Sequence, residues 1–155
     1  METLMETSAV REEVLQFVTF TLNNEEYAVD ILSVQEINRI AEITKIPNSP
    51  PYVEGVVNLR GKVIPVINLR NKFGFEKKSI DDTSRIIIMD IRGITYGIIV
   101  DSVSEVLRVQ SGTVEPTPPM SSDANSKFIK GLAKLDDRLI ILIDIDNLID
   151  EELQV

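Results

Sequence analysis

The chain has 155 residues, of which 43% are hydrophobic and 26% charged, the proportions of an ordinary globular protein. Its net charge of -9 argues against a nucleic-acid partner, because an acidic surface repels phosphate backbones. With no cysteine and no histidine, disulfides, thiolate metal sites and imidazole catalysis are excluded. Residues 1–13 are expected to be a flexible N-terminus without signal-peptide character, and no apolar run could span a bilayer, so we expect a cytoplasmic protein without direct membrane insertion.

The first part of the chain is typical of a β-hairpin. Residues 15–22 are rich in β-branched and aromatic side chains, and Asn23 and Asn24 mark a turn before the segment 26–31. Residues 32–39 fit a helix, because Val34 and Ile37 fall at helical spacing, but they fit a strand equally well. Both interpretations remain open.

A second hairpin is expected at residues 53–59 and 62–69, around the turn at Arg60 and Gly61. Residues 68–73 fit a short helix that ends at Gly74, since glycine readily adopts the conformation that closes helices. The charged stretch 76–82 is the expected connection between two halves of the chain.

The second half begins with another hairpin pattern. Residues 85–91 and 95–100 flank a turn at Arg92 and Gly93. The proline-containing stretch 111–126 predicts a surface loop with one short helical turn.

The chain closes with two further elements. Residues 131–135 and 138–145 predict a hairpin around Asp136 and Asp137. Residues 146–153 fit a C-terminal helix with Asp146 as its N-cap. We place the folded domain at 14–150 and a tail at 151–155.

An internal repeat relates the two halves. Residues 27–40 align with 96–109 without a gap, which matches Glu36 to Glu105, and residues 55–69 align with 131–145. We interpret this as a duplication that produces a mostly-β protein with two barrel-like lobes, at about 14–80 and 81–150. Some exchange of chain at the lobe boundaries is allowed by this interpretation.

Acidic residues supply the main alternative. Near the C-terminus, Asp136, Asp137, Asp144, Asp146 and Asp150 could bind a divalent metal, and Glu36 and Glu105 could act as acid and base. The aspartates lack the glycine and the spacing of an EF-hand loop, and turns commonly carry carboxylates. A carboxylate-dependent metal-binding or hydrolytic enzyme is therefore kept as the second hypothesis.

The turn around Arg60 is the main candidate for recognition. The repeat places Asp136 at the matching position, so the scaffold needs a turn there but does not need arginine. Arginine is enriched at interface hot spots, because it is always charged, donates five hydrogen bonds and stacks on apolar faces. A solvated turn arginine, or one paired internally with Glu36, is the structural alternative.

Residues 53–69, which contain Asn58-Leu59-Arg60-Gly61, resemble the signature of the CheW family of bacterial chemotaxis coupling proteins. Residues 25–37, 97–103 and 131–148 are similar to other parts of that family. The resemblance covers about 15–148 and implies two five-stranded SH3-like barrels in a non-enzymatic adaptor without a cofactor.

The resemblance also implies partners and a site. Family members join the regulatory domain of the histidine kinase CheA, which docks at barrel ends, to the cytoplasmic hairpin tip of methyl-accepting chemoreceptors, in membrane-associated arrays. The implied receptor-binding residues are Arg60, Val34, Glu36, Gly55 and Asn58 in the first half and Val103 and Val106 in the second.

Overall fold

The computed structural model describes residues 13–117 and 128–148, and these residues form two β-sheets. The first sheet, which we call lobe A, has the order β8-β1-β2-β11-β10-β9, and the second, lobe B, has the order β3-β6-β7-β5-β4. Lobe A contains β1 (Val14–Leu22), β2 (Glu25–Asp30), β8 (Ser102–Gln110), β9 (Val114–Glu115), β10 (Ile129–Leu135) and β11 (Arg138–Ile143). Lobe B contains β3 (Val34–Arg39), β4 (Val53–Leu59), β5 (Lys62–Asn68), β6 (Arg85–Ile91) and β7 (Ile94–Val100).

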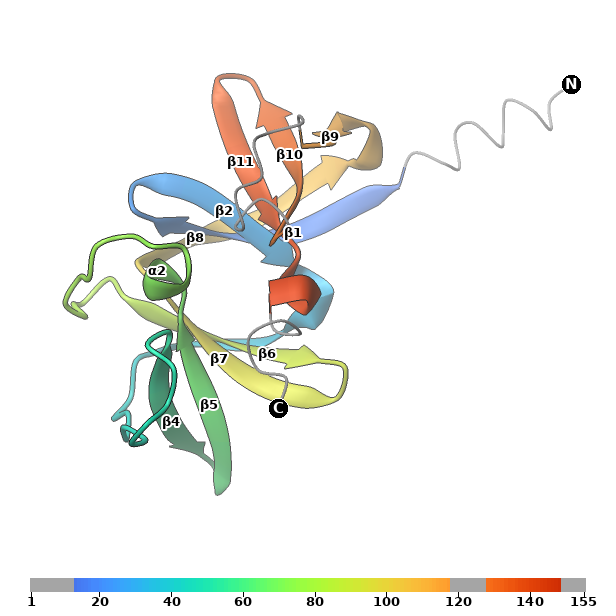
Figure 1. The fold of residues 1–155 in the computed structure, drawn as a ribbon. Coiled ribbons are helices and arrows are strands. Elements are labelled where there is room, and N and C mark those ends of the chain that lie inside the picture. The colour runs from blue at the N-terminus through green and yellow to red at the C-terminus, as the bar shows by residue number, and fades with distance from the viewer. Residues whose placement is uncertain (1–12, 118–127, 149–155) are drawn as a thin grey trace, which may run out of the picture.

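Within residues 13–117 and 128–148, helical structure is limited to short turns at the ends of strands. These are η1 (Ile31–Ser33), α2 (Leu69–Lys72), η2 (Ser111–Thr113) and a turn at 145–148. Figure 1 shows the two lobes stacked on each other, with α2 and the turn at 145–148 between them. The prediction of a mostly-β protein with two SH3-like lobes is confirmed, although β9 makes lobe A six-stranded rather than five-stranded. Among the described residues, no helix is long and apolar enough to cross a bilayer.

The two lobes share one topology, which confirms the internal duplication. The order β3-β6-β7-β5-β4 becomes β8-β1-β2-β11-β10 when each strand is replaced by its repeat equivalent. Irregularities in the ladders recur at equivalent places: β4 shifts register between Val53 and Gly55, and β10 shifts between Ile129 and Gly131. Even β9 has a counterpart, because the isolated bridge from Thr44 to Val56 matches its pairing with β10.

The sheets do not coincide with the 14–80 and 81–150 parts of the chain. Hairpin β1–β2 joins β8–β11, and hairpin β6–β7 joins β3–β5, so each half of the chain gives one hairpin to the lobe built mainly by the other half. Two parallel pairings complete the exchange: β2 lies beside β11, and β7 lies beside β5. Each lobe is therefore built from strands of both halves of the chain.

Three apolar clusters explain why this arrangement is stable. One fills lobe A and includes Phe17 and Leu142, and one fills lobe B and includes Ile64 and Ile88. The largest cluster lies between the lobes and takes side chains from both sheets, Phe20 and Met89 among them. Because each sheet buries apolar residues on both faces, neither lobe exposes its inner sheet face to water.

Several local expectations can now be compared with the structure. Residues 34–39 form a strand, which decides the open choice at 32–39. The short helix after β5 is confirmed as α2, with the Asn68 side chain accepting from Arg70 N and Asn71 N. At 111–117 the chain forms η2 and β9, while 118–127 lie outside the described residues.

The prediction of Asp146 as a helix N-cap is wrong. The helical turn begins at residue 145, and the Asp144 carboxylate accepts from Asn147 N at 3.1 Å. In the repeat Asp144 matches Asn68, which caps α2, so the same capping position is used twice. Residues 149–155 lie outside the described part of the chain, as does the N-terminal stretch 1–12.

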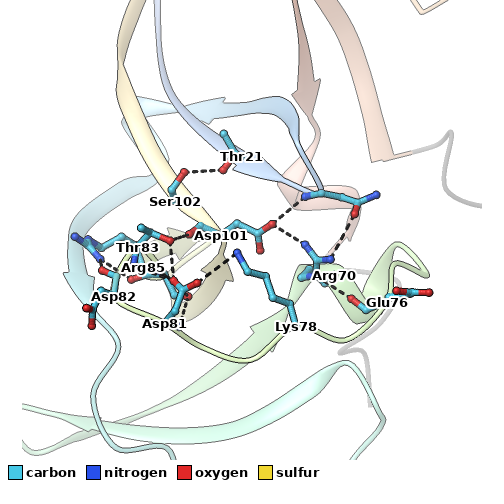
Figure 2. Close-up of polar contacts among 12 residues, drawn as sticks. Thr21, Arg70, Glu76, Lys78, Asp81, Asp82, Thr83, Arg85, Asp101 and Ser102 are labelled. Carbon is cyan, nitrogen blue, oxygen red and sulfur yellow. Dashed lines mark hydrogen bonds and ion pairs between the residues drawn. The ribbon is translucent and has the colours of Figure 1, made fainter.

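One polar cluster holds the junction between the lobes (Figure 2). Arg70, in α2, pairs with Asp101, at the start of β8, with 2.6 Å between Nη1 and Oδ2. Their side chains are only 11% and 13% exposed. Asp101 Oδ2 also accepts from Asn23 N in the β1–β2 turn, so one carboxylate ties together three elements.

Candidate functional site

The turn between β4 and β5 is closed by its own side chains. Arg60 and Gly61 both have positive φ, 51° and 83°, as a two-residue hairpin of the favoured twist requires. Asn58 accepts from Gly61 N at 2.9 Å, which fixes the turn. Left-handed backbone is unfavourable for arginine, so nothing in the backbone geometry selects this residue.

Arg60 forms an ion pair with Glu36 across the edge of lobe B. Its Nη2 contacts Glu36 Oε2, and Asn38 Nδ2 donates to Glu36 Oε1 at 2.9 Å. Hydrogen bonds from Arg60 first and Asn38 second lower the pKa of Glu36, and Glu36 raises the pKa of Arg60. The Arg60 side chain is nevertheless 70% exposed. The pairing with Glu36 considered from the sequence is thus present, and it orients an accessible guanidinium.

The second repeat uses its equivalent residues differently. Asp136 occupies the position of Arg60 with the same φ of 51°. Glu105, the equivalent of Glu36, accepts instead from Arg138, with 2.8 Å between Nη2 and Oε2. Arg138 also pairs with Glu26, so lobe A satisfies its carboxylates from within the sheet. An exposed arginine at the turn is therefore specific to lobe B.

β-bulges decide which way the candidate side chains on β3 and β8 point. The register of β3 shifts between Val34, which pairs with Met89, and Glu36, which pairs with Ile88. Met89 faces the cluster between the lobes, whereas Ile88 faces the interior of lobe B. Because cross-strand partners share a face, the bulge turns Val34 toward the other lobe and Glu36 away from it.

The same bulge in β8 places Val103 and Val106 on the inter-lobe face. Val103 pairs with Phe20 and Val106 with Val18, and both partners belong to the cluster between the lobes. Val103 is half-buried, and Val106 is 52% exposed. Sequence reasoning did not select Ile37, although the repeat matches it to Val106 and it lies at the same position on β3, 37% exposed.

Gly55 has a clear packing role in this structure. It is buried at a φ of 151°, and an added Cβ would lie 2.2 Å from the carbonyl oxygen of Thr44. Only glycine allows this approach. Gly55 therefore shapes the sheet that carries the Arg60 turn, rather than presenting a side chain.

The candidate residues form two separate groups rather than one. Glu36, Arg60 and Asn58 lie together at the β3 edge and the β4–β5 turn of lobe B. Val34 lies on the opposite face of β3, and Val103 and Val106 lie at the equivalent face of β8. The arrangement offers an oriented cation in one group and partly exposed valines in the other, and both suit binding rather than bond-breaking chemistry.

The acidic residues give no support to the metal-dependent alternative. Among residues 13–117 and 128–148, no group of three or more acidic side chains is placed to hold a metal ion. Asp136 lies in a hairpin turn and Asp144 caps a helical turn, so each has a structural role. Asp150 lies outside the described residues.

Known proteins resemble this chain over most of its length. Chemotaxis protein CheW of Klebsiella aerogenes is 39% identical over 88% of this chain and 82% of its own length. Chemotaxis protein CheW of Helicobacter pylori is 35% identical over 91% and 85%. The crystal structure of the scaffolding protein TtCheW from Thermoanaerobacter tengcongensis superposes with a TM-score of 0.82 and 42% identity, covering 89% of this chain and 94% of that one. Residues 16–153 match the family model of the CheW-like domain, and the chain therefore belongs to the CheW family.

Proposed function

We propose that this protein is a non-enzymatic scaffold that couples the cytoplasmic tips of chemoreceptors to the histidine kinase CheA. Membership of the CheW family supports the scaffold role, because the matched relatives are chemotaxis and scaffolding proteins. The proposal places the protein in the cytoplasm, at membrane-associated receptor arrays. The single observation that carries it is the exposed Arg60 turn.

Arg60 has the properties of a recognition residue. Its guanidinium is oriented by Glu36 while 70% of the side chain stays exposed, so little conformational freedom remains to be lost on binding. The matching residue in lobe A is Asp136, so the duplicated scaffold does not require this charge. The Asn58 side chain accepts a hydrogen bond from Gly61 N and so closes the turn. Gly55 allows β4, the strand before the turn, to lie close to the backbone of Thr44.

The valines provide the apolar part of the proposed receptor site. A receptor tip is a helical hairpin, and helices bind in grooves through a stripe of apolar side chains. Val34 on β3 and Val103 and Val106 on β8 face the space between the lobes, and Val106 is half exposed. We infer that they contact the apolar face of the receptor hairpin, while Arg60 sets its orientation.

The kinase is proposed to bind through its own CheW-like regulatory domain at the ends of the lobes. Two similar lobes give one small protein two docking ends. Contacts that are weak singly gain effective concentration when several partners are held in one assembly. This is how a scaffold of this size can act within an extended array.

The sharpest test compares two arginine turns of the same chain. Arg60-Gly61 and Arg92-Gly93 share positive φ values, 51° and 83° against 52° and 83°, and Asp90 caps the second turn as Asn58 caps the first. We expect Arg60→Ala to weaken binding of a receptor hairpin fragment by about 1–3 kcal/mol, as for a hot-spot residue. Arg92→Ala is the matched control and should leave receptor affinity unchanged.

Isothermal titration with a receptor fragment and with the CheA regulatory domain gives both affinities. Arg60→Ala should keep its kinase affinity and its unfolding free energy, because exposed ion pairs contribute little to stability. Equal receptor affinities for wild type and Arg60→Ala would contradict the role given to Arg60. A wild-type protein that binds neither partner would contradict the proposed function itself.

A further inference from the structure

The Glu36 carboxylate in lobe B accepts hydrogen bonds from two different side chains. Arg60 directs Nη2 at Oε2 and Nη1 at Oε1, the second at 3.5 Å. Asn38, two residues further along β3, donates from Nδ2 to the same Oε1 at 2.9 Å. A carboxylate only accepts hydrogen bonds, so Asn38 turns its amide nitrogen toward Glu36. The three side chains form one hydrogen-bonded group, which begins on the strand and ends at the exposed guanidinium.

Strand β3 itself places the Asn38 amide beside the Glu36 carboxylate. The cross-strand partners of the two residues, Ile88 and Ile86, both belong to the apolar cluster of lobe B. Residues two positions apart on a strand point the same way, so the two side chains share one face. Both are half-buried, whereas the Arg60 side chain is 70% exposed. Asn38 therefore reaches Arg60 through Glu36.

The internal repeat shows that the fold does not need an amide at this position. Asn38 matches Leu107 of β8, whose side chain packs against the lobe A cluster. The matching carboxylate, Glu105, pairs instead with Arg138. Lys62, which matches Arg138 in lobe B, donates to a threonine of β7 rather than to Glu36. The asparagine thus occurs in the lobe whose carboxylate orients an exposed arginine.

We propose that Asn38 is a positioning residue for recognition by Arg60. Glutamate has a flexible side chain, and a single ion pair at an exposed position restricts it little. The second hydrogen bond, from a short side chain of the same strand, fixes the carboxylate and through it the guanidinium. Arg60 then meets a partner in one orientation, so less conformational entropy is lost on binding. The role in binding rests on the proposed receptor function, whereas the positioning can be measured without a receptor.

Nuclear magnetic resonance tests the positioning on the unbound protein. Hydrogen bonds from Arg60 first and Asn38 second lower the pKa of Glu36. In Asn38→Leu, which copies the residue of lobe A, the pKa of Glu36 should rise toward its usual value, and the Arg60 side-chain N–H should exchange faster with water. Asn38→Gln keeps an amide donor and should stay closer to wild type in both signals. Gln35→Leu, which removes an exposed amide from the same strand, is the matched control and should change neither.

Titration with a receptor hairpin fragment tests what the positioning does for binding. Asn38→Leu should weaken receptor binding by about three- to tenfold, the effect of one hydrogen bond. In the Arg60→Ala background the same substitution should cause no further loss, because it acts through a guanidinium that is already absent. The variant should fold, since leucine occupies the matching position of lobe A, and urea unfolding checks this.

The possible failures can be told apart. An unchanged Glu36 titration in Asn38→Leu, or an Asn38→Gln protein that behaves like Asn38→Leu, would overturn the inference and leave the proposed function intact. An equal loss of receptor affinity in the wild-type and Arg60→Ala backgrounds would also overturn it, because Asn38 would then contact the receptor itself or only support the strand. A wild-type protein that binds no receptor fragment would overturn the proposed function and the binding role of Asn38 together, whereas the Glu36 titration would still report whether Asn38 positions Arg60.

Discussion

Lobes A and B are two versions of one fold within a single chain, and their differences separate what the fold needs from what each lobe adds. Both keep the same strand order and equivalent bulges. They differ at one β-turn, where Arg60 in lobe B corresponds to Asp136 in lobe A. They also differ opposite the bulge of the edge strand, where Thr19 in lobe A corresponds to Ile88 in lobe B. Positions that differ between the copies are those at which side-chain chemistry was free to specialise.

The junctions between the lobes differ in the same way. On one side, Arg70 and Asp101 form a mostly buried ion pair, and the connection at 76–84 lies against it (Figure 2). On the other side the matching residue to Asp101 is Leu32, which is 90% exposed. An ion pair therefore stabilises the junction at Asp101, whereas the matching position in the other repeat exposes the apolar side chain of Leu32 to water.

The largest effect is expected at the glycines that begin the second hairpin of each repeat. Gly55→Ala should lower the unfolding free energy by about 4 kcal/mol, because positive φ and a clash with backbone act together. Gly131→Ala should lower it by about 1 kcal/mol, since its added Cβ would lie 3.0 Å from Glu115 O on the two-residue strand β9. Urea unfolding followed by circular dichroism measures both. Equal losses would show that the lobes need this glycine alike.

The next effect concerns the junction. Asp101→Ala should lower the unfolding free energy by about 3 kcal/mol, because it leaves the mostly buried charge of Arg70 without its only carboxylate partner among the described residues. Leu32→Asp, at the matching position, should change it by less than about 0.5 kcal/mol, since the side chain is already in water. A similar loss of unfolding free energy in the two variants would mean that both sides of the junction contribute equally to stability, which would contradict this prediction.

A smaller effect is expected at the bulge of β8. Thr19 is fully buried, and its hydroxyl donates to Glu105 O and accepts from Glu105 N, both at 3.2 Å. Thr19→Val removes both contacts and should lower the unfolding free energy by about 1–2 kcal/mol. Hydrogen exchange at the Glu105 amide should speed up in Thr19→Val. Thr21→Val, a partly exposed position on the same strand, is the control and should leave that amide protected.

The smallest effect is a pH dependence at the entrance to β6. Hydrogen bonds, first from Thr83, lower the pKa of Asp81 from 3.8 to about 2. A lowered pKa in the folded state means that the contribution to stability is complete above pH 3.8 and is lost as the pH falls toward about 2. Asp81→Asn does not titrate, so wild type should lose more unfolding free energy than this variant over that interval. Parallel curves in acid urea titrations would contradict the assignment.

Much of the fold could be predicted from local pattern. Alternating apolar residues and turn pairs such as Arg92-Gly93 predicted the hairpins, and Asn68 with Gly74 predicted α2. The capping residue at 144 was missed, although the repeat aligns it with Asn68 and could have indicated it. The strand at 34–39 could not be chosen over a helix, because pairing with β6 decides it and that pairing is not local.

The candidate site was predictable only in part. Arg60 stood out because the second repeat lacks it, and that comparison needs no structure. The separation of Val34 from Glu36 could not be foreseen, since a one-residue bulge turns neighbouring side chains to opposite faces. The ungapped repeat already matched Ile37 to Val106, and the structure added that the cross-strand partners of both residues, Ile87 and Val18, belong to the cluster between the lobes.

By itself, the sequence determined where along the chain most strands and turns occur, the duplication and the family. Each of these can be recognised from the pattern of residues in short segments. Tertiary structure alone decided that each half gives a hairpin to the opposite lobe, since the choice among similar strand partners depends on burying both faces of both sheets at once. It also brought Arg60 to Glu36 across the edge of lobe B, because these residues lie 24 positions apart and only the folded sheet places them side by side.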